Sequence, residues 1–291
     1  MTQNNSINHS MSGMSLFLKK ISRDPLGILG LILVTGMIFS ALAAEWIIPY
    51  DIAALDIPER LASPSLDHFL GTDHLGRDVF SRVIMGGRIA LWVALVSTAV
   101  SLTIGTILGL IAGYGPRWLD NLLILSFDAV RSFPTIMFAL AMVTLLGPSM
   151  NTVIFVVIAT SIPAYGRVVR TQTQALKHNE FILAEQSQGA GMIRVLLVHM
   201  LPNVIGPLLI IASMDIPVVV TIEAGLSFLG LGVKPPTPSW GSILYDGYSF
   251  IRNTPWIIIA GGLPLVLTTL GFTFLGESLR DIFDPKLNKE Q

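Results

Sequence analysis

The chain has 291 residues, of which 52% are hydrophobic and 13% are charged, and its formal net charge is −1. Soluble domains carry roughly 25% charged residues, so this composition indicates an integral membrane protein. The few basic side chains are dispersed, which argues against nucleic acid as a partner, and the absence of cysteine excludes disulfides, thiolate metal sites and cysteine nucleophiles.

Six apolar segments are long enough to cross a membrane as helices, because a hydrocarbon core of about 30 Å takes roughly 20 apolar residues. Pro163 interrupts the fourth segment, and Pro207, Asp215 and Pro217 interrupt the fifth. Membrane helices tolerate such breaks where neighbouring groups satisfy the freed backbone. The sequence therefore predicts an all-α integral membrane protein with six transmembrane helices at 26–48, 89–112, 119–146, 153–169, 201–222 and 256–275.

The basic residues near the ends of these segments predict the orientation, because Lys and Arg favour the cytoplasmic side. Lys19, Lys20 and Arg23 precede the first segment, which places the N-terminus inside. Six crossings return the C-terminus to the same side. Both termini are therefore predicted to be cytoplasmic, and the segment 49–88 is predicted to be external although it carries four arginines.

Two external segments are expected to be ordered. The first is "LGTDHLGRDVFSRVIMGGRIAL", in which glycines allow tight turns and Arg–Asp pairs allow local salt bridges. The second is "LSFLGLGVKPPTPSWG", where glycines and prolines predict a nonhelical path over 226–241. Asp67, His68, Asp73 and His74 offer ligands for a metal such as nickel, but local hydrogen bonding is the favoured interpretation, so no metal site is predicted.

The polar stretch "EQSQGAGMIRVLLVHMLPN" lies between the fourth and fifth apolar segments. Asn179 is a good N-cap, Glu180 sits in the first turn, and Gly189 can supply a left-handed end, so a short helix is expected over 180–188. A second helix is expected from Met192 until Pro202 stops or kinks it. This helix–turn–helix on the cytoplasmic surface could contact lipid headgroups, pack on its own bundle or dock on another protein.

The same stretch resembles the cytoplasmic coupling motif of ABC importer permeases, known by its Glu-Ala-Ala start. The matching positions are Ala184, Gly189, His199, Leu201, Pro202 and Asn203. Together with both external segments and the closing "LGESLRDIFDPKL", they make residues 24–287 similar to the dipeptide, oligopeptide and nickel permease family, specifically its C-type, second permease subunit.

The resemblance implies a type I ABC importer transmembrane fold and a layout of the chain. That layout is a cytoplasmic N-terminal segment at 1–25, a first transmembrane helix at 26–48, an external ordered segment at 49–88, an ABC type-1 transmembrane domain at 89–280 with a cytoplasmic coupling region at 177–203, and a cytoplasmic tail at 281–291.

One position departs from the family pattern. The family has Glu, Ala, Ala aligned with Leu183, Ala184 and Glu185, so the acidic position holds Leu183 here. At about 100° per residue, Glu185 lies about 200° from Leu183, nearly on the opposite helix face. Glu180, three residues before Leu183, lies on nearly the same face as Leu183 and is the better candidate for the polar contact.

The chain has no "GxxxxGK[ST]" phosphate loop, so no ATP binding of the usual kind, no catalytic residue and no cofactor is expected in it. The resemblance implies that ATP and Mg are bound by two separate ABC ATPase subunits. It also implies a second homologous permease, an external substrate-binding protein and a lipid environment in the bacterial cytoplasmic (inner) membrane. The expected substrate is a short peptide, with nickel or a peptide-like conjugate as the alternative.

Two other function classes fit the sequence less well. An autonomous secondary transporter would account for the broken fourth and fifth segments, but it leaves the cytoplasmic turn without a role. A membrane-embedded enzyme lacks a paired catalytic signature.

Three charged residues inside predicted spans are candidates for a translocation path, because charges within a membrane are costly and often functional. They are Asp215 in the fifth segment and Asp128 and Arg131 in the third. Since Asp128 and Arg131 are spaced i, i+3 close to the kink expected at Pro134, a structural ion pair between helices is an equal alternative for those two.

Overall fold

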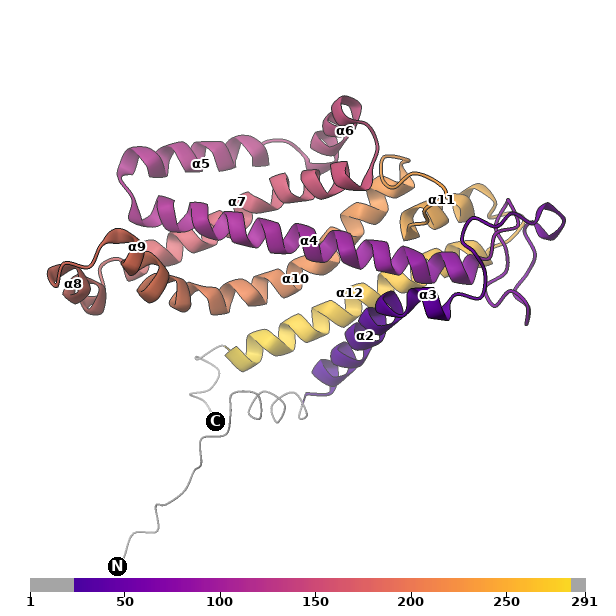
Figure 1. The fold of residues 1–291 in the computed structure, drawn as a ribbon, viewed down its shortest axis with the longest axis horizontal. Helices are drawn as coiled ribbons and strands as arrows, with labels where there is room; N and C mark the ends of the chain where they lie inside the picture. Colours follow the sequence, from indigo (N-terminus) through magenta and orange to yellow (C-terminus); the bar gives the residue numbers. More distant parts are fainter. Residues whose placement is uncertain (1–23, 284–291) are drawn as a thin grey trace, which may run out of the picture.

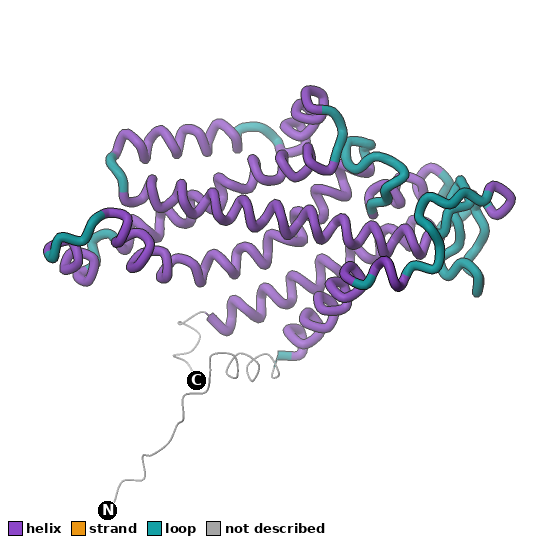
Figure 2. Tube along the Cα trace, viewed as in Figure 1, coloured by secondary structure: helices purple, strands orange, loops and turns teal. Residues whose placement is uncertain are grey.

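The computed structural model describes residues 24–283, and within that range it consists of helices and their connections (Figure 2). The long helices form an elongated bundle with α8 and α9 at one end and α11 with the segment 48–78 at the other (Figure 1). The elements are α2 (Pro25–Leu42), α3 (Ala44–Ile47), η1 (Ile57–Glu59), α4 (Val79–Tyr114), α5 (Arg117–Arg131), α6 (Thr135–Leu146), α7 (Met150–Leu176), α8 (Glu180–Ser187), α9 (Met192–Arg194), η2 (Val195–Met200), α10 (Leu201–Phe228), α11 (Trp240–Ser249) and α12 (Trp256–Phe283).

Five helices of the described part are long and apolar enough to cross a membrane: α2, α4, α7, the run Met192–Phe228 and α12. The sixth predicted span, 119–146, is not one straight helix, because α5 and α6 meet at an angle of 87°. Pro134 lies in the break between them, where its ring and missing N–H prevent the helix from continuing. Residues 24–283 are thus all-α, with five candidate spans, or six if the bent pair crosses as one. The predicted segments 1–25 and 281–291 lie almost entirely outside the described residues.

Helix α4 begins well before the predicted start at residue 89. Asp78 caps it, because its carboxylate accepts a hydrogen bond of 2.7 Å from the backbone N–H of Ser81. The helix has 36 residues, so it is about 54 Å long, compared with about 30 Å for a hydrocarbon core. The helix is therefore longer than a hydrocarbon core is thick, and its first turns carry the charged residues Arg82 and Arg88.

Helices α4 and α7 pack closely through a row of glycines on α4. Gly105, Gly109 and Gly113 recur every four residues and thus share one face. A Cβ atom on Gly109 would lie only 2.5 Å from the carbonyl oxygen of Gly166 on α7. Small residues at such spacing let helix backbones approach each other within a membrane. Helices α4 and α7 are therefore in close backbone contact along this row of glycines.

The buried apolar side chains form two clusters, one toward each end of the bundle. At the end with α11, the indole N–H of Trp240 donates to the carbonyl oxygen of Val83 at 2.9 Å, and its ring lies against Gly86 and Gly87. At the end with α8, Ile182, Met200 and Tyr165 are buried together. Each end of the bundle is therefore packed around its own cluster of buried side chains.

The path predicted to be nonhelical over 226–241 is shorter than expected. Helix α10 continues through Phe228 despite Pro207 and Pro217, and α11 begins at Trp240. Helix α11 was not predicted from the sequence, although Ser239 caps it reciprocally with Ser242. The prolines lie within the nonhelical connection between α10 and α11. The connection ends immediately after Pro238, because the Ser239 cap starts α11 there.

Candidate functional sites: coupling element, central cavity and basic pocket

The helix–turn–helix predicted over 177–203 is present, and residues 180–200 are called the coupling element below. Helix α8 ends at a turn in which Gly189 has φ of +85°, a left-handed conformation that favours glycine. The backbone N–H of Ala190 donates to the Glu185 carbonyl oxygen at 3.0 Å, which closes this turn. Ile182 is completely buried and holds α8 against the bundle.

The two acidic candidates of the coupling element lie on different faces of α8. The Oε2 atom of Glu185 lies 3.4 Å from Nε2 of His199, so Glu185 faces η2 and the bundle. Leu183 is 46% exposed, and Glu180 and Ala184 are exposed beside it. Glu185 therefore does not occupy the outward position of Leu183, as the angle between them predicts.

The second half of the coupling element joins α10 without a stop, so of the two outcomes predicted for Pro202, a stop or a kink, the stop is wrong. In η2 the backbone follows a π-helical path, and the N–H of Leu201 donates to the carbonyl oxygen of Leu196, five residues back. Pro202 lies directly after this π-helical turn, in the first turn of α10. The Nδ2 atom of Asn203 donates to the His199 carbonyl oxygen at 2.6 Å. A displacement of the coupling element would thus pass directly into α10.

A cavity of about 420 Å³ near the bend between α5 and α6 contains two of the three predicted path residues. Asp215 of α10 and Arg131 of α5 both line it, together with Thr160 and Ser161 of α7. The hydroxyl of Tyr165 donates to Oδ2 of Asp215 at 2.9 Å. This central cavity therefore offers one acidic and one basic group beside the hydroxyls of Thr135, Thr160 and Ser161.

Asp128 does not line the central cavity and does not pair with Arg131. Its Oδ1 atom accepts a hydrogen bond of 2.5 Å from Nη2 of Arg167 on α7, and the two side chains are 57% and 40% exposed. The ion pair between helices that the sequence suggested exists, but its basic partner is Arg167. Because Arg167 is distant in sequence, no local spacing could identify it.

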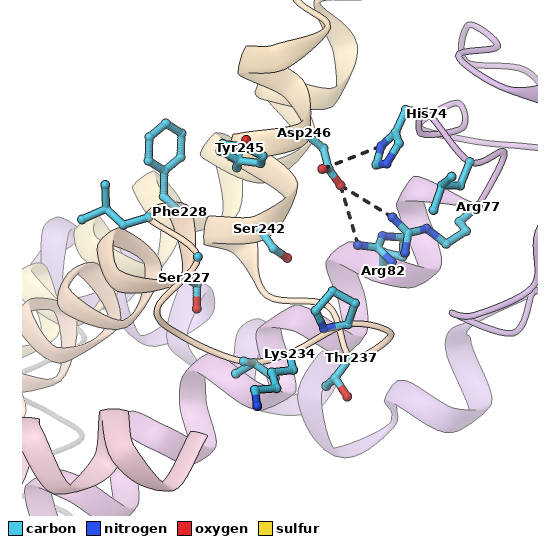
Figure 3. A pocket seen from close by; sticks show the side chains of 15 residues that line it. His74, Arg77, Arg82, Ser227, Phe228, Lys234, Thr237, Ser242, Tyr245 and Asp246 are labelled. Carbon is cyan, nitrogen blue, oxygen red and sulfur yellow. Dashed lines mark ion pairs between the residues drawn. The ribbon is translucent and has the colours of Figure 1, made fainter. Parts of the chain in front are cut away.

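A second cavity, of about 440 Å³, lies at the end of the bundle that carries α11 and is called the basic pocket below. Asp246 of α11 faces three basic side chains there: its carboxylate oxygens lie 3.7 Å from His74 Nδ1, 3.7 Å from Arg77 Nη2 and 3.9 Å from Arg82 Nη2 (Figure 3). Burial raises the pKa of Asp246 above its usual range, and the neighbouring His74, Arg82 and Arg77 oppose that rise.

Behind the basic pocket, Asp73 connects the same two arginines. Its carboxylate accepts a hydrogen bond of 2.7 Å from Nε of Arg77 and lies 3.4 Å from Nε of Arg82. All three side chains are at least nine-tenths buried. The Arg–Asp pairing predicted for this segment is therefore present, and only its extension to Asp246 was not predicted.

The histidines of the segment 48–78, which could have offered metal ligands, contact carboxylates instead. Nδ1 of His68 lies 2.9 Å from the carboxylate of Asp78. Ligand atoms of Asp73, His74 and Asp246 lie within 4.8 Å of one another, close enough for one ion. However, Arg77 and Arg82 contact both carboxylates of this group, and their positive charges oppose a cation between them.

Residues 105–289 match the family described as the binding-protein-dependent transport system inner membrane component, and residues 12–64 match the N-terminal transmembrane domain of oligopeptide transport permease C. The chain is 38% identical to the dipeptide transport system permease protein DppC of Alkalihalophilus pseudofirmus, over 92% of this chain and 88% of the relative. It is 39% identical to the glutathione transport system permease protein GsiD of Pectobacterium atrosepticum, over 93% and 90%.

The fold is shared with a solved structure of the MetNI methionine ABC transporter in an inward-facing conformation. The superposition has a TM-score of 0.58 and covers 69% of this chain and 96% of that chain, at 18% sequence identity. The likeness at this identity concerns the fold alone, which is the one that the resemblance in the sequence predicted.

Proposed function

The chain belongs to the family of inner membrane components of binding-protein-dependent transport systems, and from this premise we propose that it is one permease subunit of an ATP-driven importer of short peptides. Family membership and the apolar helices make it a multi-pass inner-membrane permease. Relatives named for dipeptide and glutathione transport support peptides as the substrate class.

The observation that carries the proposed mechanism is the continuous path from the coupling element to the central cavity. The exposed face of α8, with Glu180, Leu183 and Ala184, docks on an ATPase subunit. Closure of the ATPase dimer displaces α8, and η2 transmits the displacement into α10 without a break. Helix α10 carries Asp215, so ATP hydrolysis on the partner subunits reshapes the cavity.

The remaining partners follow from the same proposal. A second, homologous permease completes the path, two ATPase subunits bind ATP and Mg, and an external binding protein delivers the peptide. The end with α8 is then cytoplasmic, and the end with α11 and the segment 48–78 is external. The central cavity suits a zwitterionic peptide, because Asp215 can accept its ammonium group and Arg131 its carboxylate.

The proposal is tested by reconstituting the affinity-purified chain, with the subunits that copurify in mild detergent, into proteoliposomes. We expect a second permease and an ATPase to be recovered, and we expect uptake of a labelled dipeptide that requires ATP and the external binding protein. Uptake by the chain alone, driven by an ion gradient, would contradict the proposal and favour a secondary transporter. Mass spectrometry of the ligand on the binding protein separates peptides from a metal chelate.

A further inference from the structure

We propose that the basic pocket binds the carboxylate of a short peptide before the peptide reaches the central cavity. This inference rests on the proposed function, which supplies the peptide and places the pocket on the external side. The site is formed by Arg77 and Arg82, by Lys234 in the connection between α10 and α11, and by Asp246 of α11.

The charges around the pocket favour an anion. Arg77, Arg82 and Lys234 line it, whereas Asp246 at its wall and Asp73 behind it are the carboxylates in contact with the two arginines. Three cationic side chains thus face two carboxylates, and one formal positive charge is left over. A single carboxylate balances this surplus, whereas a divalent cation would add to it.

Arg82 also has hydrogen-bonding capacity that the pocket does not use. The residue is 4% exposed, and among the described residues its Nη1 atom has no hydrogen-bond partner. A buried guanidinium nitrogen without an acceptor is costly. Arg82 lines the pocket beside Arg77, and guanidinium groups recognise planar carboxylates through their N–H donors.

The opposite side of the pocket is apolar and aromatic, with Phe228 and Tyr245 among its lining residues (Figure 3). Phe228 packs edge-on against Tyr245, with ring centroids 5.9 Å apart. The volume of about 440 Å³ lies within the range of small-molecule sites. A small amphiphilic ligand fits these features, and the recessed position of Arg82 disfavours an acidic side chain on the surface of a folded protein.

The pocket is connected to the central cavity by a single helix. Ser227 at the end of α10 lines the pocket, and Asp215 on the same helix lines the cavity. Twelve residues of α-helix separate them, which corresponds to about 18 Å. A peptide held in the pocket is therefore at the outer end of the helix that the coupling element moves.

The experiment measures binding of the dipeptide Ala-Phe and of its C-terminal amide to the whole transporter complex in nanodiscs, by calorimetry, without the external binding protein. We expect the amide to bind at least about tenfold more weakly, because it loses a charge-assisted hydrogen bond. Arg82→Gln is expected to weaken Ala-Phe binding about tenfold, and Lys234→Gln about threefold because Lys234 is exposed and its charge is screened.

Arg88→Gln is the matched control, because Arg88 lies on the same helix, is exposed and pairs with Glu45; we expect it to bind as the wild type does. Arg82→Gln could fail because it misfolds. Lys234→Gln tests the same pocket without that risk, since Lys234 has no part in the buried ion network. Equal affinity for Ala-Phe and its amide would overturn the inference, as would an Arg82→Gln variant that loses affinity for the external binding protein but keeps affinity for Ala-Phe.

Failure of this inference is distinguishable from failure of the proposed function. If Arg82→Gln keeps ATP-driven dipeptide uptake and the complex shows no preference for the free carboxylate, the role of the pocket is contradicted and the importer function stands. If the wild-type complex shows no ATP-driven peptide uptake, the proposed importer function itself is contradicted.

Discussion

The two ends of the bundle are stabilised by different interactions. At the end with α11, Asp73, Arg77 and Arg82 form a buried ion network, and the indole N–H of Trp240 is anchored on the carbonyl oxygen of Val83. At the end with α8, Ile182 is buried, and Glu185 and His199 form one partly exposed pair. Removing one partner of a buried ion pair costs about 3–5 kcal/mol, whereas a partly exposed pair contributes about 0–1 kcal/mol. The difference indicates a rigid frame at the end with α11 and a movable coupling element at the end with α8.

The strongest test of this comparison is Asp73→Asn. The substitution leaves Arg77 and Arg82 without their shared buried carboxylate, and we expect the free energy of unfolding to fall by about 3–5 kcal/mol. Thermal unfolding in detergent measures the loss. Asp128→Asn is the control, because the Asp128–Arg167 pair is exposed and such pairs contribute about 0–1 kcal/mol. Equal losses in both variants would mean that burial of the network has no special role.

The second test concerns the apolar anchor of the coupling element. Ile182→Ala removes a completely buried side chain from α8, and we expect a loss of about 2–4 kcal/mol, less than for Asp73→Asn. The loss should be local, so hydrogen exchange should increase over residues 180–200 and stay unchanged around Trp240. Leu183→Ala, at an exposed position of the same helix, should leave exchange unaltered. Increased exchange at both ends would contradict the separation between them.

The third test uses two glycines of one turn. Gly189 has φ of +85° and Gly191 has φ of −71°, and a Cβ atom at either would meet nothing within 4 Å. Gly189→Ala should therefore destabilise the turn by about 1–2 kcal/mol through backbone strain alone, whereas Gly191→Ala should be nearly neutral. If the turn positions α8 on an ATPase, Gly189→Ala also lowers the stimulation of ATPase activity by peptide-loaded binding protein. If Gly189→Ala and Gly191→Ala lost the same stability, backbone strain at residue 189 would not be the cause of the loss.

Much of this arrangement was predictable, because it depends on patterns that are local in the sequence. The apolar segments located the helices, and the glycine at 189 predicted the turn that the structure contains. The break at Pro134 was expected only as a kink, since the sequence does not show how far α6 turns away. Helix α11 was missed because the neighbouring prolines obscured the Ser239 cap.

The sites were less predictable, because their partners are distant in the sequence. Arg131 and Asp215 come together only through the packing of α5, α7 and α10 around the central cavity. The basic pocket likewise requires Asp246 to meet residues of the segment 48–78 and of α4. No spacing rule joins such positions, although the unusual number of arginines in a segment predicted to be external was a signal that they have acidic partners.

The smallest expected effect comes from the polar pair of the coupling element. Glu185 and His199 are 28% and 21% exposed and lie 3.4 Å apart, so Glu185→Gln should cost less than about 1 kcal/mol. Because Glu185 faces the bundle, the same variant should keep wild-type coupling between peptide and ATPase activity. Glu180→Gln, on the exposed face beside Leu183, should weaken coupling without changing the unfolding temperature. If Glu185→Gln abolished coupling while Glu180→Gln did not, the outward face of α8 would not be the docking face, and the pair with His199 would be the contact that transmits force.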